Sequence, residues 1–230
     1  METQFKSEQT KQSSVHTTLF LRDSFYDFVG ENGEIVFFDS AKDVLTLLDP
    51  ELKLQTQLVP TEMKKRFDET VAEYAKVPED GKRFLGKPSF QEEWEPTSGQ
   101  LTLQSYWIDY TIKTHPFPAA GMSEQFFSFS DWICFLLFRT NPDIGTPYTR
   151  VEVNRILREK DRFPRTISVS IYPKGKRLMA QEDRFSTVSQ ISQTLTASDR
   201  KRIEQATGFM RRFTVVPFDE YQKKIATKKR

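Results

Sequence analysis

Runs of apolar residues separated by turn residues divide the first part of the chain. Residues 25–29 and residues 35–38 are two such runs, and Asn32-Gly33 lies between them. Asn-Gly adopts positive φ at low cost, so this pattern predicts a β-hairpin. Residues 39–48 begin with two residues that favour the N-cap position and end before a proline, which predicts a short helix.

Three further elements follow in the first half. From Met63 to Tyr74, apolar residues are spaced i, i+4, i+8 and i+11, which places them on one side of a helix. This spacing predicts a surface helix over residues 61–74. Residues 82–99 contain two prolines and several glutamates and are expected to form a long loop. Between residues 101 and 114 apolar side chains alternate with one change of phase, which predicts one long or bulged strand.

A proline-rich break at residues 115–121 separates this half from the next. After it we expect a short strand over residues 124–129. A buried helix then starts at the capping residues Ser130-Asp131 and contains the longest apolar run of the chain. A second helix is predicted over residues 149–161, because its first four residues match a capping box.

Two β-rich runs follow, residues 166–172 and residues 177–179, around the basic turn Pro173-Lys174-Gly175-Lys176. The order of two helices and a basic hairpin resembles that of a winged-helix module, and the resemblance is one of pattern only. The ten or so residues between the two helices are long for a compact helix-turn-helix, which argues against the module.

The last part of the chain is less regular. Residues 186–195 have apolar positions three and four apart and favour a weak helix. Residues 198–208 begin with two capping residues and predict another helix. Residues 213–216 favour a strand at a sheet edge, and the tail, residues 223–230, is rich in lysine.

Together these elements predict an α+β fold of helices and antiparallel strands. Residues 1–16 are rich in Gln, Ser and Thr and contain one aromatic residue, so we expect a mobile arm. Residues 17–114 then form an acidic half and residues 122–230 a basic half, either as two domains or as one continuous domain.

The composition narrows the class of protein. Hydrophobic residues make up 37% of the 230 positions, and 20 phenylalanines predict an aromatic-rich core. The longest apolar run, residues 132–138, is far shorter than the roughly 20 residues of a membrane span. The start of the chain lacks the apolar segment of a secretory signal, and one cysteine excludes an intramolecular disulfide. We expect an intracellular protein, cytoplasmic or nuclear, with no membrane segment.

The net charge of +2 conceals an uneven distribution. Residues 1–138 hold 13 Lys/Arg and 22 Asp/Glu, whereas residues 139–230 hold 21 and 10. The two parts therefore carry −9 and +11. This asymmetry indicates either an anionic partner for the basic part, such as nucleic acid or an acidic protein surface, or neutralisation of one half by the other within the fold.

Enzyme signatures are largely missing. The sequence has no phosphate-binding loop, dinucleotide-binding glycine motif or nucleophile elbow. His16 and His115 are far apart, which argues against a histidine-based triad. Cys134 has apolar neighbours and is typical of a small buried hydrophobic residue. We expect no enzymatic activity and no cofactor.

Carboxylates could support a metal-dependent hydrolase. Glu92, Glu93, Glu95 and Asp109, together with Lys113, carry the groups that bind and assist Mg²⁺. The strand from Asp109 to Lys113, however, lacks the closely spaced acid-x-Lys of nuclease cores, and a solvated acidic loop accounts for these residues better. We therefore expect no metal ligand.

The basic half contains the candidate nucleic-acid-binding residues. On the predicted helix over residues 149–161, Asn154, Arg155 and Arg158 lie roughly opposite the apolar face. In a major groove, Arg suits guanine and Asn suits adenine. Basic residues of the hairpin turn and of a second cluster complete the candidate set: Lys174, Lys176, Arg177, Arg211 and Arg212.

Other interpretations compete with this hypothesis. Glu152 and Glu159 lie three and four residues from Arg155, so these charges can form an ordinary solvated helix face. The charge asymmetry also suits a capsid- or scaffold-type subunit, a homo-oligomer in which acidic and basic halves of successive copies meet. The sequence predicts a non-enzymatic DNA- or RNA-binding protein, with structural assembly and metal-dependent hydrolysis as alternatives.

Overall fold

The computed structural model describes residues 1–7, 13–30, 33–141, 146–172, 175 and 183–228. Within these residues the chain forms six helices and twelve strands. Every strand pair whose register is described is antiparallel, except that β12 runs parallel to β6. The predicted α+β fold class is confirmed.

Two units share the chain, and their segments interleave. Unit 1 contains residues 1–2, 15–62 and 192–230, and unit 2 contains residues 3–14 and 63–191. The proline-rich break at residues 115–121, the predicted boundary between halves, leads from a strand into a helix inside unit 2. The predicted halves 17–114 and 122–230 therefore do not coincide with the units.

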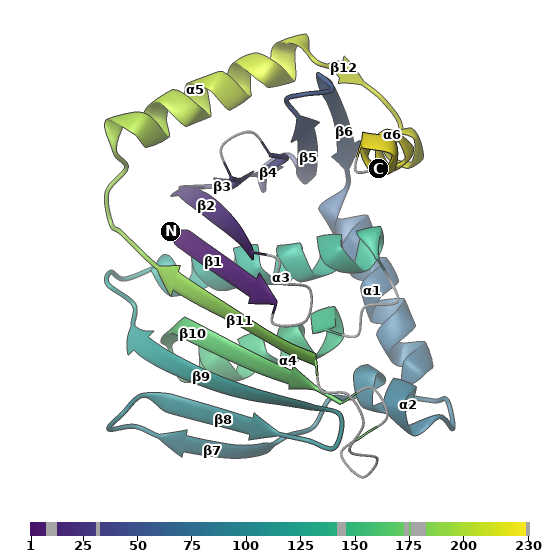
Figure 1. The fold of residues 1–230 in the computed structure, drawn as a ribbon, viewed down its shortest axis with the longest axis vertical. Coiled ribbons are helices and arrows are strands. Elements are labelled where there is room, and N and C mark those ends of the chain that lie inside the picture. The colour runs from purple at the N-terminus through teal and green to yellow at the C-terminus, as the bar shows by residue number, and fades with distance from the viewer. Residues whose placement is uncertain (8–12, 31–32, 142–145, 173–174, 176–182, 229–230) are drawn as a thin grey trace. The chain divides into compact units, whose positions relative to one another are not determined.

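Unit 1 has a sheet with the strand order β12-β6-β5-β4-β3-β2 (Figure 1). Its strands are β2 (Ser13–Leu21, of which residues 15–21 belong to this unit), β3 (Ser24–Val29), β4 (Ile35–Asp39), β5 (Val44–Asp49), β6 (Leu54–Leu58) and β12 (Thr214–Val215). Two helices complete the unit, α5 (Ala197–Arg212) and α6 (Phe218–Lys228).

Helix α5 packs on one face of this sheet because its apolar side meets an aromatic surface. The buried cluster between them contains Leu19, Tyr26, Phe28, Ile35, Leu48 and Ala206. A capping box between Thr196 and Asp199 starts the helix, two residues before Ser198, the first capping residue that the sequence indicated, and the helix continues beyond the predicted end at residue 208. The predicted hairpin is the β3–β4 pair, whose turn residues 31–32 lie outside the described residues.

Two predictions for unit 1 were wrong. Residues 39–48 do not form a helix; they contain the end of β4 and most of β5. Strand β5 lies between β4 and β6 and is buried on both faces, so its sequence has no polar alternation to mark it as a strand. The predicted arm, residues 1–16, contains β1 (Glu2–Ser7) and the start of β2.

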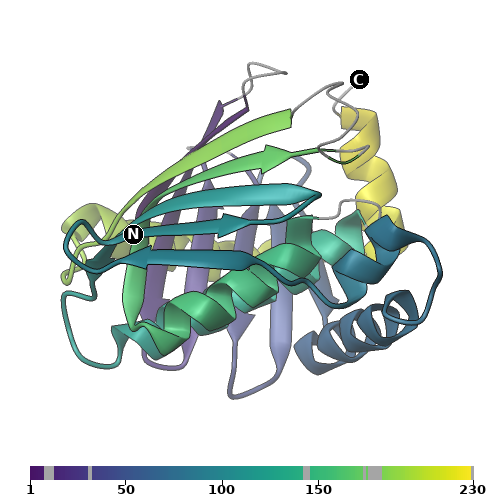
Figure 2. The ribbon, with the colours of Figure 1, turned by 90° about the horizontal axis from the view of Figure 1, so that it is seen from below.

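Unit 2 has a sheet with the order β1-β11-β10-β9-β8-β7, seen from below in Figure 2. Its strands besides β1 are β7 (Gln91–Glu95), β8 (Gln100–Gln104), β9 (Ile108–Pro116), β10 (Arg162–Ile171) and β11 (Asp183–Gln190). Its helices are α1 (Pro60–Tyr74, from Met63 onwards), α2 (Asp80–Gly86), α3 (Met122–Thr140) and α4 (Thr146–Glu159).

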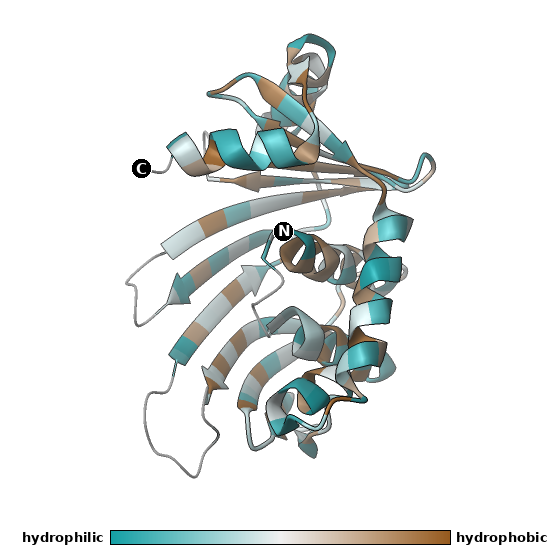
Figure 3. Cartoon of the chain, turned by 90° about the vertical axis from the view of Figure 1, so that its right-hand side faces the viewer, coloured by the Kyte–Doolittle hydropathy of each residue, from teal (hydrophilic) through white to brown (hydrophobic). Residues whose placement is uncertain are grey.

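Helices α3 and α4 cover one face of this sheet (Figure 2). Hydrophobic and hydrophilic residues alternate along its strands (Figure 3). The core is aromatic, as the phenylalanine content predicts. The Phe67 ring of α1 lies 5.0 Å from Phe135, 5.4 Å from Phe138 and 5.2 Å from Tyr148 between centroids. This packing fixes α1 against α3 and α4.

The structure corrects four predictions for unit 2. The predicted loop over residues 82–99 contains most of α2 and all of β7, and residues 124–129 belong to α3 and not to a strand. Residues 186–190 continue β11 and do not form a helix. The long strand over residues 101–114 is the hairpin β8–β9, and its change of phase is the turn.

The winged-helix arrangement is not confirmed. Two helices and an antiparallel strand pair follow one another as predicted, but β10 pairs with β11 on one edge and with β9 on the other. The predicted wing is therefore an internal part of a larger sheet. Residues 177–179, its predicted second strand, lie outside the described residues.

Candidate nucleic-acid interface

The predicted reading helix corresponds to α4, but Asn154 is fully buried in it. Its side-chain amide donates to Asp131 at 2.7 Å, and its carbonyl oxygen accepts from Arg150 Nε at 2.9 Å and from Ser130 Oγ at 3.1 Å. These bonds join α4 to α3. Asn154 therefore has a packing role and does not reach a groove.

The two arginines predicted on the same helix are paired with carboxylates. Arg155 contacts Glu152 at 2.7 Å and also pairs with Glu159, as the competing interpretation stated, and these partners raise the pKa of its guanidinium. Arg158 donates to Asp131 at 2.7 Å and lies over the ring of Phe127. The structure thus gives α4 an ion-paired outer face.

The remaining predicted residues divide into two groups. Lys174, Lys176 and Arg177 lie outside the described residues. Arg211 and Arg212 form the last turn of α5 in unit 1, where both are exposed and Arg212 donates to the carbonyl of Gly208 at 3.1 Å. The structure describes five of the eight predicted residues. Four of these five are exposed: Arg155 and Arg158 in unit 2, and Arg211 and Arg212 in unit 1.

Charge is largely balanced inside each unit. Unit 1 holds 13 Lys/Arg and 14 Asp/Glu, and unit 2 holds 21 and 18, so their net charges are −1 and +3. Within unit 1, residues 15–62 have a charge of −6 and residues 192–230 have +6. The chain's asymmetry therefore reflects the order of segments along the sequence and produces no strongly basic unit.

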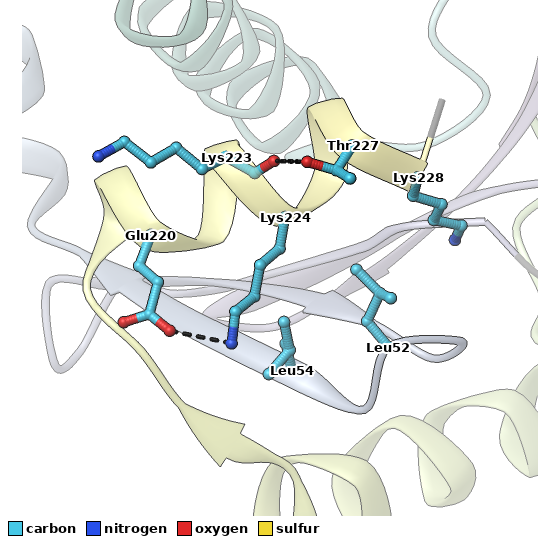
Figure 4. Close-up of a pocket in the computed structure, with 7 residues that line it drawn as sticks. All are labelled: Leu52, Leu54, Glu220, Lys223, Lys224, Thr227 and Lys228. Atoms are coloured by element: carbon cyan, nitrogen blue, oxygen red, sulfur yellow. Dashed lines mark hydrogen bonds and ion pairs between the residues drawn. The ribbon is translucent and has the colours of Figure 1, made fainter. Parts of the chain in front are cut away.

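Helix α6 illustrates this balance (Figure 4). Lys228 contacts the buried carboxylate of Asp49 at 3.0 Å and Glu51 at 2.7 Å, and Lys224 contacts Glu220 at 2.9 Å. A shallow pocket of about 580 Å³ lies between the helix and the residues before and at the start of β6; it is lined by Leu52, Leu54, Glu220, Lys223, Lys224, Thr227 and Lys228. Two of its three lysines are thus already neutralised.

A second pocket, in unit 2, combines aromatic rings with cations. It measures about 460 Å³ and lies between α2, the segment that follows it and the β8–β9 turn. We call it the aromatic–basic pocket; its lining residues are Asp80, Arg83, Phe84, Lys87, Ser89, Tyr106 and Trp107. It lies wholly among the described residues.

The turn between β8 and β9 presents the two largest rings of this pocket. Ser105 Oγ accepts from the backbone N–H of Trp107 at 3.2 Å and of Ile108 at 2.9 Å, and it donates to the carbonyl of Ile108 at 2.7 Å. The Tyr106 and Trp107 rings meet edge to face with centroids 4.9 Å apart. Tyr106 remains 40% exposed, which is unusual for a large ring in this chain.

The segment after β10 is fixed to the same turn. The backbone N–H of Tyr172 donates to the carbonyl of Trp107 at 2.8 Å, and that of Gly175 donates to the carbonyl of Tyr172 at 2.8 Å. A Cβ at Gly175 would lie 1.9 Å from a ring carbon of Tyr106, and φ is +75° there. Only glycine allows this approach, so the backbone closes directly over the ring.

The cations of the aromatic–basic pocket differ in their pairing. Arg83 pairs with Asp80, three residues earlier on α2. Lys87 is exposed, and among the described residues no carboxylate oxygen lies within 4.0 Å of its ammonium group. The sequence did not point to this pocket, because Arg83 and Lys87 lie in the predicted loop and Tyr106 and Trp107 in the predicted strand.

Two of the carboxylates considered for a metal-dependent hydrolase have structural partners. Glu92 contacts Lys160 at 2.5 Å, and Asp109 accepts from Tyr172 at 3.1 Å and from the backbone N–H of Ser105 at 3.0 Å. Among the residues that the structure describes, no group of three or more His, Cys, Asp or Glu side chains could hold a metal ion. Burial raises the pKa of the Cys134 thiol to about 12.

One polar cluster escaped the sequence analysis, which placed His16 in an arm. His16 Nδ1 lies 2.9 Å from Asp27 Oδ2, and Thr18 Oγ1 donates to Asp27 Oδ1 at 2.8 Å. The hydrogen bond to this buried carboxylate raises the pKa of His16. The register that pairs Thr18 with Asp27 brings these side chains to one face of unit 1.

Comparisons with known proteins give no family for this chain: no family model matches it, and no curated protein resembles it in sequence. In the described part of the chain, no helix is both long and apolar enough to cross a membrane.

Proposed function

We propose that this protein binds single-stranded nucleic acid, without catalysing a reaction, through the aromatic–basic pocket. The observation that supports the proposal is the exposed ring of Tyr106, which lies beside Trp107 and Lys87; Lys87 has no carboxylate partner among the described residues, whereas Arg83 is paired with Asp80. Rings stack on bases irrespective of sequence, and cations contact the phosphates that link them.

The geometry favours single strands over duplexes. A duplex buries the faces of its bases in the helical stack, whereas an unpaired base offers a face to an aromatic side chain. At about 460 Å³ the pocket falls in the range of roughly 300–1,000 Å³ that is usual for sites holding a molecule of nucleotide size. One or two nucleotides would occupy it, with the strand continuing over the surface.

This proposal moves the interface away from α4. Asn154 is buried and Arg155 and Arg158 are paired, so these residues contribute little to a phosphate-binding surface. Lys174, Lys176 and Arg177 lie outside the described residues, and their predicted role stays a proposal from sequence. Arg211 and Arg212 belong to unit 1 and are a separate, weaker candidate.

Fluorescence anisotropy with labelled single-stranded and duplex oligonucleotides, at salt concentrations from 50 to 300 mM, tests the proposal. We expect tighter binding of the single strand and a loss of about tenfold or more for Tyr106→Ala, because stacking contributes roughly 1–3 kcal/mol per base. Lys87→Ala should weaken binding and reduce the slope of log K against log salt by about 0.7.

Lys76→Ala is the matched control for Lys87→Ala. Lys76 is exposed, also lies in unit 2 and does not line the pocket, so its loss should leave the affinity within about twofold of the unmodified protein. The proposal is wrong if the protein binds no oligonucleotide at 50 mM salt, or if Tyr106→Ala and Lys87→Ala both bind as tightly as Lys76→Ala.

The assembly hypothesis stays a prediction. It drew on the charge asymmetry along the chain, most of which is compensated within the units. Measurement of the molecular mass by light scattering, over a range of protein and salt concentrations, would show a salt-sensitive increase if acidic and basic surfaces of different copies meet.

A further inference from the structure

We infer that the aromatic–basic pocket selects guanine over the other bases, through the carboxylate of Asp80. This inference rests on the proposed function and adds a specificity to it. Of the seven residues that line the pocket, Asp80 is the only one with a carboxylate, and it lies among the residues that supply the three rings. A purely electrostatic phosphate site would gain nothing from a negative charge at this position.

The chemistry of the bases explains the choice. A carboxylate only accepts hydrogen bonds, and its two oxygens can accept two parallel ones. The Watson–Crick edge of guanine presents two adjacent donors, N1–H and the N2 amino group. Adenine and cytosine each present one amino donor beside an acceptor nitrogen, and uracil or thymine presents one N–H between two carbonyls. Only guanine therefore matches both oxygens of a carboxylate without opposing an acceptor to an acceptor.

Asp80 retains the capacity for these bonds. Arg83 Nη2 donates to Oδ1, and among the described residues Oδ2 has no hydrogen-bond partner. An ionised carboxylate has about four lone-pair positions, so the pair with Arg83 leaves room for both guanine donors. The side chain of Asp80 is 71% exposed, which leaves it accessible to a ligand.

Arg83 has two consequences for such a site. It holds Asp80 by an i,i+3 pair on α2, which limits the rotamers of both side chains. Its positive charge also offsets the repulsion between Asp80 and the phosphates of a bound strand. A base stacked on the rings, with its edge toward Asp80 and its phosphate toward Lys87, would contact the aromatic, the acidic and the basic side chains of the pocket.

A simpler explanation also accounts for Asp80. It is the first residue of α2, where a negative charge interacts favourably with the helix dipole, and Arg83 is then an ordinary surface partner. That explanation gives Asp80 no influence on which base binds. The two explanations therefore differ in one measurable quantity, the base preference.

The experiment compares four single-stranded oligonucleotides that differ at one central position. A thymidine 9-mer carries dG, dA, dC or dT at its centre; a single dG avoids guanine-rich structures. The unmodified protein should bind the dG probe about tenfold more tightly than the other three, since a good bidentate pair discriminates by roughly 5- to 150-fold. In Asp80→Asn, whose amide presents one donor and one acceptor, this preference should fall to within about twofold while binding persists.

Glu79→Gln is the matched control. Glu79 precedes Asp80, pairs with Lys82 at 3.0 Å and does not line the pocket, so the dG preference should survive its neutralisation. If the unmodified protein binds no probe, the proposed function fails together with this inference. If all four probes bind equally and Tyr106→Ala still weakens them, the proposed function stands and guanine selection is overturned. Guanine selection is also overturned if Asp80→Asn retains the dG preference.

Discussion

Asn154 of α4 donates its side-chain amide to Asp131 of α3 at 2.7 Å, and the second oxygen of the same carboxylate accepts from Arg158 at 2.7 Å. The residue that the sequence offered as a reader of adenine is thus the centre of a polar network between two helices. Arg150, whose pKa is lowered by burial, depends on the same asparagine through its Nε. Removing the asparagine affects both charged neighbours.

We therefore predict that Asn154→Ala destabilises the protein by about 2–4 kcal/mol, because it removes a hydrogen-bond partner from two charged groups, Asp131 and the partly buried Arg150. Urea denaturation followed by tryptophan fluorescence measures the change. Arg155→Ala, which removes exposed ion pairs on the same helix, should cost less than about 1 kcal/mol. Equal effects of the two substitutions would show that the network adds no stability beyond that of a surface pair.

The His16–Asp27 pair predicts a dependence of stability on pH. Because the pKa of His16 is raised in the folded protein, its contribution is complete below the unfolded value of about 6.5 and is lost as the pH rises through the folded pKa. The difference in unfolding free energy between the unmodified protein and His16→Asn should therefore be larger at pH 5.5 than at pH 9.

Proton NMR supplies a direct check on this pair, since the chain has two histidines. One imidazole should titrate above the ordinary value in the unmodified protein and shift to a lower pKa in Asp27→Asn. His115 lies on a different strand and is the internal reference. An unchanged titration of His16 in Asp27→Asn would contradict the assigned cause.

Lys228 should stabilise unit 1 through Asp49, whose side chain is only 4% exposed. Lys228→Ala leaves this buried carboxylate with the backbone N–H of Leu52 as its remaining described donor, so we expect a loss of about 1–3 kcal/mol. Lys224→Ala, on the same helix, breaks a pair that is exposed on both sides and should cost less than about 1 kcal/mol. Thermal unfolding of the two variants in parallel gives the comparison.

Gly175→Ala should impair the aromatic–basic pocket without removing any of its lining side chains. The added methyl group would meet Tyr106, and alanine is strained at the positive φ found there, so the ring or the backbone must move. We expect weaker binding of single strands in the anisotropy assay. Gly208→Ala, in α5, meets only the end of the Arg212 side chain and should leave binding unchanged.

Cys134 should be unreactive in the folded protein. With a pKa of about 12, only about one thiol in ten thousand is ionised at pH 8, and the side chain is buried. Ellman's reagent should therefore detect no thiol in buffer and one thiol per chain in 6 M guanidinium chloride. Rapid reaction under native conditions would show that the α3 region opens readily.

The sequence predicts an element correctly where one side of that element stays exposed, because the alternation of polar and apolar residues is then visible. Helix α1 keeps one polar side and was predicted to within a residue at its start. Strand β5 lies inside a sheet, so its apolar run Val44–Leu48 could not be distinguished from a helix. Tertiary position, and not propensity, decides such segments.

Helix α3 shows a different difficulty. Ser130 and Asp131 have the chemistry of N-cap residues, and the sequence therefore predicted that a helix begins there. They lie in the middle of α3 because their side chains bind partners on α4, Ser130 through Asn154 and Asp131 through Asn154 and Arg158. The neighbouring sequence does not show whether such a residue caps a helix or makes a buried polar contact with a distant segment.

The aromatic–basic pocket could not be predicted for the same reason. Its residues come from α2, from the segment that follows and from a turn some twenty residues further on; the first two stretches resemble a loop in sequence, and the third resembles part of a strand. The one local signal was the change of phase near Ser105, which marks the turn that presents Tyr106 and Trp107. A hairpin predicted at that point would have placed Tyr106 and Trp107 in its turn.

The interleaving of the two units has a consequence for synthesis on the ribosome. Once residue 191 has been made, unit 2 has all of its segments, whereas unit 1 still lacks residues 192–230, including the helix that covers its aromatic cluster. The strands of unit 1 that are made first therefore keep their apolar surface exposed until residues 192–230 have been made. Exposed apolar surface of this kind makes nascent chains prone to aggregation and to binding by chaperones. Completion of unit 1 therefore depends on contacts between residues 15–62 and residues 192–230, which are far apart in the sequence and for that reason form slowly.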